Sequence, residues 1–250
     1  MPEANSTVIR KIVNNIVEEN RTLIEDTYNG RADLSASQYK RLVPLLLDRG
    51  LEQADLSMFE EDTRKSILDA AGIEYIRRGN LPAATQAFVL SENTELLTKV
   101  GDIYQSYADL DSAIESYQLA GNQARLRQLG QRCMENQHLR TAKRVFTILE
   151  DLDQLDRIGR ECIKREKFDV ALEIFSALQD KVTLTGIGDL NMLKNDYEIA
   201  FQAYRAAEDN ARTNVLGDEC LKNGYLRLAR ECYVASGNEA MLSFLSQNTR

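Results

Sequence analysis

The chain has 250 residues, with 31 basic and 39 acidic side chains and a formal net charge of −8. Its 43% hydrophobic and 28% charged residues exclude an intrinsically disordered chain and a membrane-embedded one. The acidic balance argues against a broad phosphate-binding face, and the presence of only three prolines favours long helices.

Residues 1–64 follow no repeat and predict an N-terminal helical cap. Apolar residues recur at helical spacing from Ile9 to Ile24, which predicts one amphipathic helix of about 20 residues. A second helix is predicted around residues 42–47, with a kink or a start near residue 42 because Pro44 breaks a helix interior. We expect this cap to cover the first hairpin of the array that follows.

The sequence also predicts where the protein resides. The N-terminus lacks the apolar core of a signal peptide, and no stretch approaches the roughly 18 apolar residues of a membrane span. The four cysteines are spaced 29, 58 and 12 residues apart, which matches no zinc or redox motif. We therefore expect a cytoplasmic protein with reduced thiols, no membrane contact and no bound metal.

A 29-residue repeat occupies residues 65–238. Glycine recurs at this interval, alanine stands twelve residues after each glycine, and an aromatic residue stands four residues after the alanine. A large apolar or aromatic residue also stands nine residues after each glycine. The glycines are Gly72, Gly101, Gly130, Gly159, Gly188 and Gly217, and the aromatic residues are Phe88, Tyr117, Phe146, Phe175, Tyr204 and Tyr233.

Each repeat predicts two short helices joined by a turn. In the second repeat, residues 97–104 show one apolar stripe, residues 107–109 form a turn, and residues 110–120 show another stripe. Pro82 falls where a second helix should begin, a position at which its missing N–H is harmless. One hairpin cannot bury both stripes, so neighbouring hairpins must stack into a solenoid.

Small residues have a structural role in this prediction. The repeated glycine and alanine let the paired helices approach closely, and the aromatic residue fills the space beside them. Gly121 and Gly237, each followed by asparagine, are expected to end a helix in the left-handed conformation.

The repeat resembles a known family. The run Leu97-x2-Val100-Gly101-x2-Tyr104, followed by Ala113-x3-Tyr117, resembles the tetratricopeptide pattern. The period is shorter than that family's period of about 34 residues, and the family's proline is missing from every repeat. The period is also similar to that of the helical-hairpin solenoids in vesicle-coat and intraflagellar-transport subunits. The resemblance implies an all-α, right-handed α-solenoid of about six antiparallel helix hairpins between N- and C-terminal capping helices.

Residues 239–250 predict a C-terminal capping helix. Leu242 and Leu245 stand where the next repeat would place its apolar residues, so this segment forms half of another repeat. The alternative is that Met241 and Phe244 present an exposed edge through which the chain self-associates as a structural subunit.

In tetratricopeptide proteins the first helices line a concave face that binds peptides or helices. Mixed charge on this face would suit a protein partner with its own charge pattern, and the alternative is that these residues only keep the solenoid soluble. Carried over by position, the partner-binding residues are Asp69, Arg77, Asp102, Gln105, Arg127, Gln131, Asp156, Arg160, Lys164, Asp189, Asn214, Asp218 and Lys222.

Candidates for catalysis are few. The only histidine, His138, lies in a predicted turn and is expected to face solvent. The sequence around Gly186 and Gly188 imitates a dinucleotide-binding loop, but it lacks the third glycine and a preceding strand. Cys133, Cys162 and Cys220 share one repeat position and are expected to be core residues. We predict no catalytic residue, cofactor or metal.

The predicted function is therefore a non-catalytic scaffold or adaptor that binds a partner protein on the concave face. Self-association through the terminal helices, which would give a homodimer, is the alternative. RNA binding is a weaker hypothesis, because the basic pairs at 77–78 and 164–165 form no continuous stripe and many aromatic residues are committed to the core.

Overall fold

A computed structural model describes residue 43 and residues 56–248, and all regular structure within these ranges is helical. The chain separates into two compact units, residues 1–126 and 127–250, and their boundary falls inside helix α8 (Gln123–Glu135). The predicted all-α fold class is confirmed for the described residues. The predicted helix from Ile9 lies outside them. Of the predicted helix at 42–47 they include only Val43, which is helical and buried.

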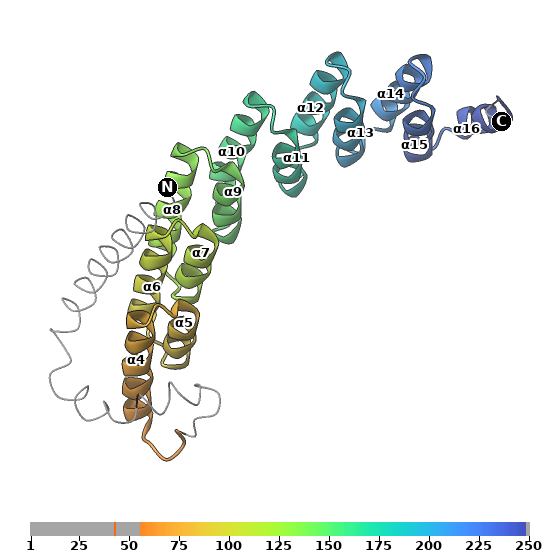
Figure 1. The fold of residues 1–250 in the computed structure, drawn as a ribbon. Helices are drawn as coiled ribbons and strands as arrows, with labels where there is room; N and C mark the ends of the chain where they lie inside the picture. The colour runs from red at the N-terminus through yellow and green to blue at the C-terminus, as the bar shows by residue number, and fades with distance from the viewer. Residues whose placement is uncertain (1–42, 44–55, 249–250) are drawn as a thin grey trace, which may run out of the picture. The chain divides into compact units, whose positions relative to one another are not determined.

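The described part of the first unit contains two helical hairpins, followed by the start of α8 (Figure 1). Within it, α4 packs on α5, α5 on α6, and α6 on α7. Leu56 and Phe59, which precede α4, pack against the buried cluster of the first hairpin. Helix α4 begins before the predicted start of the repeats at residue 65. The helices are α4 (Glu61–Arg77), α5 (Leu81–Leu90), α6 (Thr94–Ser106) and α7 (Leu110–Leu119).

The second unit continues the same arrangement, and each of its helices from α9 to α16 packs on the next one. Helices α9, α11, α13 and α15 also contact one another in series. The helices are α9 (Leu139–Ile148), α10 (Leu152–Lys164), α11 (Phe168–Ala177), α12 (Lys181–Leu193), α13 (Tyr197–Ala206), α14 (Asn210–Lys222), α15 (Leu226–Ser236) and α16 (Glu239–Asn248).

The helix lengths account for the 29-residue period. First helices such as α6 and α10 have 13 residues, and second helices such as α7 and α11 have 10. Two three-residue turns complete the period, except that α15 has 11 residues and the turn after it has two. Pro82 lies in the first turn of α5, as the sequence predicts.

Each turn contains a left-handed residue, and in most turns the residue after it caps the next helix through its side chain; His138, Lys167 and Tyr225 do not. Between α6 and α7, Ala108 has φ 59°, and the backbone N–H of Asp109 donates to the carbonyl of Tyr104 at 3.0 Å. The Asp109 side chain then accepts a hydrogen bond from the backbone N–H of Ser112. One residue thus closes one helix and caps the next, which keeps the turn at three residues. Gly121 and Gly237 have φ 64° and 71°, which confirms their predicted conformation.

The repeated glycine lies against the repeated aromatic ring. A Cβ atom on Gly101 would lie 2.5 Å from Tyr117, and one on Gly188 would lie 2.3 Å from Tyr204. All six repeat glycines meet the aromatic residue of their own repeat in this way, and all six of these rings are buried. The predicted close approach of the paired helices is confirmed. The contact holds each first helix in a fixed rotation, with one stripe of residues facing away from the hairpin.

Candidate protein-interaction surface

In each unit, the outward stripes of the first helices form the candidate surface, and we call these stripes the first-helix face. In α12, Leu184, Ile187 and Gly188 are buried, while Val182 and Gly186 are exposed. The outward positions are spaced by four, three and four residues, which places them in one row along the helix. The rows are 95, 99, 102 and 106 in α6; 124, 128, 131 and 135 in α8; 153, 157, 160 and 164 in α10; 182, 186, 189 and 193 in α12; and 211, 215, 218 and 222 in α14.

All thirteen predicted partner-binding residues lie on first helices, but they differ in exposure. Six are exposed: Arg77, Arg127, Gln131, Arg160, Lys164 and Lys222. Seven are partly buried: Asp69, Asp102, Gln105, Asp156, Asp189, Asn214 and Asp218. Within the units, Asp102 lines a hollow of the first and Asp189 one of the second, and the concavity of the face stays a prediction.

Three of the partly buried aspartates accept hydrogen bonds from the core tyrosines of their own repeats. The Tyr204 hydroxyl donates to Asp189 at 2.8 Å, and the Tyr233 hydroxyl donates to Asp218 at 2.8 Å. The third pair is Asp102 with Tyr117, at 2.7 Å. Burial, reinforced by the neighbouring carboxylate, raises the pKa of Tyr204, which therefore stays a hydrogen-bond donor. These aspartates therefore have a role inside the fold.

The sequence contains a signal for this tyrosine–aspartate bond, although the repeat position of the aspartates alone does not reveal it. Aspartate follows the repeat glycine in the three repeats whose aromatic residue is tyrosine. The same position holds Ile73, Gln131 and Arg160 in the repeats with phenylalanine, which has no hydroxyl to donate. Comparing the two positions repeat by repeat is the signal that finds the bond.

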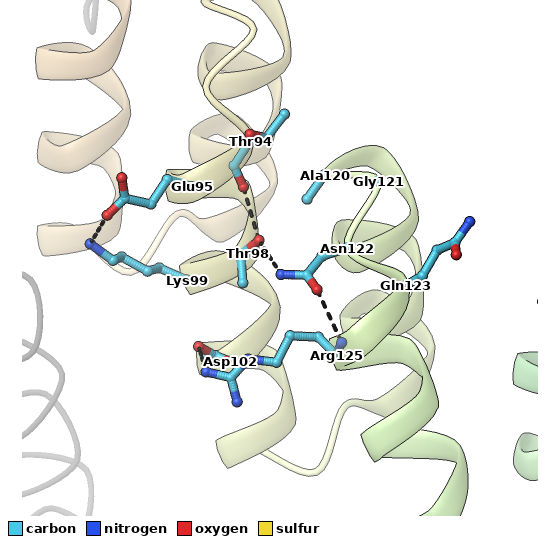
Figure 2. Close-up of a pocket in the computed structure, with 10 residues that line it drawn as sticks. All are labelled: Thr94, Glu95, Thr98, Lys99, Asp102, Ala120, Gly121, Asn122, Gln123 and Arg125. Atoms are coloured by element: carbon cyan, nitrogen blue, oxygen red, sulfur yellow. Dashed lines mark hydrogen bonds and ion pairs between the residues drawn. The ribbon is translucent and has the colours of Figure 1, made fainter.

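In the first unit, a hollow lies between α6 and the start of α8, with a volume of about 560 Å³. Figure 2 shows Asn122 reaching back to the Thr98 hydroxyl at 3.3 Å and also capping the next helix at Arg125. The Arg125 guanidinium forms an ion pair with Asp102 at 3.3 Å. The hollow is polar, and its charged groups are paired with one another.

An equivalent hollow of about 810 Å³ lies in the second unit between α12 and α14. Its ion pair joins Arg212 to Asp189 at 2.9 Å, and these residues stand 87 positions, or three repeats, after Arg125 and Asp102. Two of the residues that line the hollow differ between the two units. Val182 replaces Glu95, and Gly186 replaces Lys99, so this hollow is wider and more apolar.

The remaining partly buried polar residues are also bonded within the fold. Asp69 accepts from Ser91 at 2.5 Å and from Asn93 at 2.8 Å, and burial raises its pKa despite these bonds. Asn214 accepts from Asn238 at 2.6 Å in the equivalent position. Of the predicted binding residues, the exposed ones are therefore five cations and one glutamine.

Sequence reasoning missed the exposed apolar residues of this face. Val182 and Leu193 are each 84% exposed, on the outward row of α12. The sequence signal was present, because the equivalent positions in α6 and α10 hold polar or charged residues, and those in α8 hold Ala124 and Glu135. Gly186 lies inside α12, as Gly188 does, so neither belongs to a strand–loop–helix nucleotide site.

The other predicted chemical groups lie where the sequence placed them. Cys133, Cys162 and Cys220 are buried, and burial raises the pKa of the Cys162 and Cys220 thiols to about 11. His138 is exposed and precedes α9 without capping it through its side chain. Within the described residues, no three histidine, cysteine, aspartate or glutamate side chains gather as a metal site would require.

No protein-family model matches the chain, and no curated protein matches it. The tetratricopeptide likeness therefore rests on the residue pattern and on the helical hairpins alone. None of the helices in the described ranges combines the length and apolar composition needed to cross a membrane.

Proposed function

We propose that this chain is a non-catalytic, cytoplasmic protein-interaction scaffold of the tetratricopeptide-like type. In this proposal about six hairpins wind into a right-handed α-solenoid, and the first-helix face binds a segment of a partner protein. The observation that supports this proposal most is that each repeat has separate packing positions and outward-facing positions. Glycine, alanine and aromatic residues pack the hairpin, while the outward rows hold exposed side chains and, in two places, a hollow.

The exposed cations of the second unit provide the sharpest test. Arg127→Glu, Arg160→Glu and Lys164→Glu together reverse three exposed charges on α8 and α10 without touching the buried core. We expect this triple variant to lose most of the partner that co-purifies with the tagged chain from its native cells. The reason is that charge reversal on a rim slows association and adds like-charge repulsion. Quantitative mass spectrometry of the recovered proteins measures the loss.

Arg227 supplies a matched control, because it lies on α15, away from the first-helix face, and its side chain is 93% exposed. Arg227→Glu should leave partner recovery unchanged. Equal recovery from the wild-type chain, the control and the triple variant would contradict the proposed binding face. Circular dichroism of each variant shows that the fold is retained.

Self-association is the second candidate, and one observation favours it. Phe244 on the last described helix, α16, is 50% exposed, whereas Leu245 beside it is buried in the core. Met241 is partly buried against the same core, so a charge there would disturb the fold as well as any interface. We therefore expect Phe244→Glu to convert a concentration-dependent dimer into a monomer in sedimentation experiments. A wild-type chain that stays monomeric at all concentrations would remove this candidate.

A further inference from the structure

Exposed apolar side chains on the first-helix face gather on α12 and α14. Val182 and Leu193 are each 84% exposed and Val215 is 53% exposed. Between them Gly186 leaves the helix surface bare, because nothing lies within 4 Å of the place where its Cβ would stand. We call these four residues the α12–α14 patch. Exposed apolar residues grouped on neighbouring helices are typical of interaction surfaces on soluble proteins.

The patch borders the wider of the two hollows. Val182 and Gly186 line it, and its ion pair, Asp189 with Arg212, is already formed. Asp189 also accepts the Tyr204 hydroxyl, so its carboxylate is bonded from two directions. An incoming apolar side chain would meet a neutralised polar floor and an apolar rim, and its burial needs no new charge to be paired.

Cations lie next to the patch, on α10. Arg157, Arg160 and Lys164 form three of the four residues in its outward row, and all three are exposed. In Figure 1, α10, α12 and α14 follow one another along one side of the second unit. The neighbourhood of α10 and α12 is also fixed by the ion pair between Glu166 and Lys194, which joins the turns that follow these helices.

The α10 cations have free hydrogen-bonding capacity. Arg160 uses two nitrogens on Asp156, which leaves donors of its five N–H groups available, and the Lys164 side chain is 75% exposed with Glu161 only at 3.7 Å. In the second unit, the carboxylates of Asp189 and Asp218 accept tyrosine hydroxyls and that of Asp156 is paired with Arg160. The outward row of α10 holds three cations and a single acid, Asp153. Charge complementarity therefore favours an acidic occupant rather than a basic one.

We propose that α10, α12 and α14 bind an acidic–apolar segment of a partner protein. The segment's carboxylates lie over Arg157, Arg160 and Lys164, and an apolar side chain enters the hollow beside Val182 and Gly186. This inference rests on the proposed function and names the chemistry of the partner. Successive first helices are separated by at least the roughly 10 Å of directly packed helices, and an extended chain rises about 3.3 Å per residue. The acidic residue should therefore stand about three to six positions from the apolar one.

A random dodecapeptide library displayed on phage and selected on the purified full chain tests this chemistry directly. We expect the enriched peptides to combine aspartate or glutamate with leucine, isoleucine, phenylalanine or methionine at that separation. Labelled synthetic copies should bind the wild-type chain in fluorescence anisotropy. Binding should weaken at least tenfold in the Val182→Asp/Leu193→Asp variant, and several-fold in Arg160→Ala.

Matched controls separate the patch from general surface effects. Val234→Asp changes an exposed apolar residue on α15, and Arg227→Ala removes an exposed cation from the same helix. Both should change the peptide affinity less than twofold. The acidic contribution should also weaken as salt is raised, because exposed ion pairs are screened.

The outcomes distinguish this inference from the proposed function. Peptides that lose affinity in Arg77→Glu or Arg127→Glu but not in Val182→Asp/Leu193→Asp would overturn the α12–α14 site and leave the scaffold function standing. Enriched peptides that are basic, or that lack a bulky apolar residue, would overturn the proposed chemistry. Peptides that no first-helix variant weakens, or selective binding of a single-stranded RNA oligonucleotide in place of any peptide, would overturn both.

Discussion

The substitutions Gly188→Ala and Gly186→Ala add the same methyl group two residues apart in α12, and we expect opposite effects on stability. Gly186 is exposed, and its added Cβ would meet nothing within 4 Å. Alanine is a better helix former than glycine by about 1 kcal/mol. Gly186→Ala should therefore raise the free energy of unfolding by up to about 1 kcal/mol.

At Gly188 the same atom would lie 2.3 Å from Cε1 and 2.5 Å from Cδ1 of Tyr204, whereas ordinary contacts begin at 3.4 Å. The ring must withdraw by roughly 1 Å, but it is 2% exposed and its hydroxyl is bonded to Asp189 at 2.8 Å. Over-packing a core costs about 1–3 kcal/mol, and the strained hydrogen bond adds about 1 kcal/mol. After the helix-propensity gain, Gly188→Ala should lose about 1–3 kcal/mol.

Urea unfolding followed by circular dichroism measures both variants against the wild type. The clash is isolated by repeating the Gly188→Ala substitution in a Tyr204→Leu background, where the ring is absent. There the added methyl group should become neutral or stabilising, which gives a coupling energy well above 0.5 kcal/mol. If Gly188→Ala were as stable as Gly186→Ala, or if its penalty persisted without the ring, the packing argument would be wrong.

Three further changes test the turns, the tyrosine bonds and a buried carboxyl. Ala108→Gly should raise the free energy of unfolding by about 0.5–1 kcal/mol, because Ala108 has the left-handed φ of 59° that glycine adopts without strain. Ala120→Gly, at a helix end with right-handed geometry, should lower the free energy of unfolding. Shifts of the same sign in urea unfolding would contradict this reasoning. Tyr233→Phe should cost about 1 kcal/mol, since it removes the hydroxyl donated to Asp218, and an unchanged unfolding midpoint would argue against that bond. Burial raises the pKa of Asp69 above 3.8, so the folded state holds this proton more tightly and the carboxyl's contribution to stability falls as pH rises through the raised pKa. The side chain of Asp69→Asn cannot ionise, so the melting temperature of this variant should rise relative to that of the wild type between acid and neutral pH. A difference in melting temperature that stays constant with pH would refute the raised pKa of Asp69.

The hairpin array could be predicted because its strongest constraints are local and repeated. Gly101 and Tyr117 lie 16 residues apart in one hairpin, and that contact recurs every 29 residues. A close approach between two helices tolerates only glycine at such a point, so the pattern survives in the sequence. The left-handed conformation of Gly121 follows in the same way from the geometry of a helix end.

The candidate site could be predicted only in part, because exposure depends on side chains that reach across from the following repeat. Asp69 was predicted to face a partner, but the side chain of Asn93, in the turn before α6, donates a hydrogen bond to it. Asp189 is reached by Arg212, 23 residues later, as well as by its own tyrosine. A carboxylate's position in the repeat therefore fixes its helix and its row, but not whether it is available.

Net charge is a poor guide to the first-helix face for the same reason. The chain carries −8, and on that balance alone a basic or mixed partner would be expected. Many of the acidic side chains, however, accept hydrogen bonds within the fold, either from backbone N–H groups at helix starts or from the hydroxyls of core tyrosines. The aspartates that cap helices in this way are Asp109, Asp151, Asp180, Asp196 and Asp209. These capping acids lie in turns and off the outward rows. In the outward row of α10, Arg157, Arg160 and Lys164 outnumber Asp153, so a partner segment meets a net positive charge there.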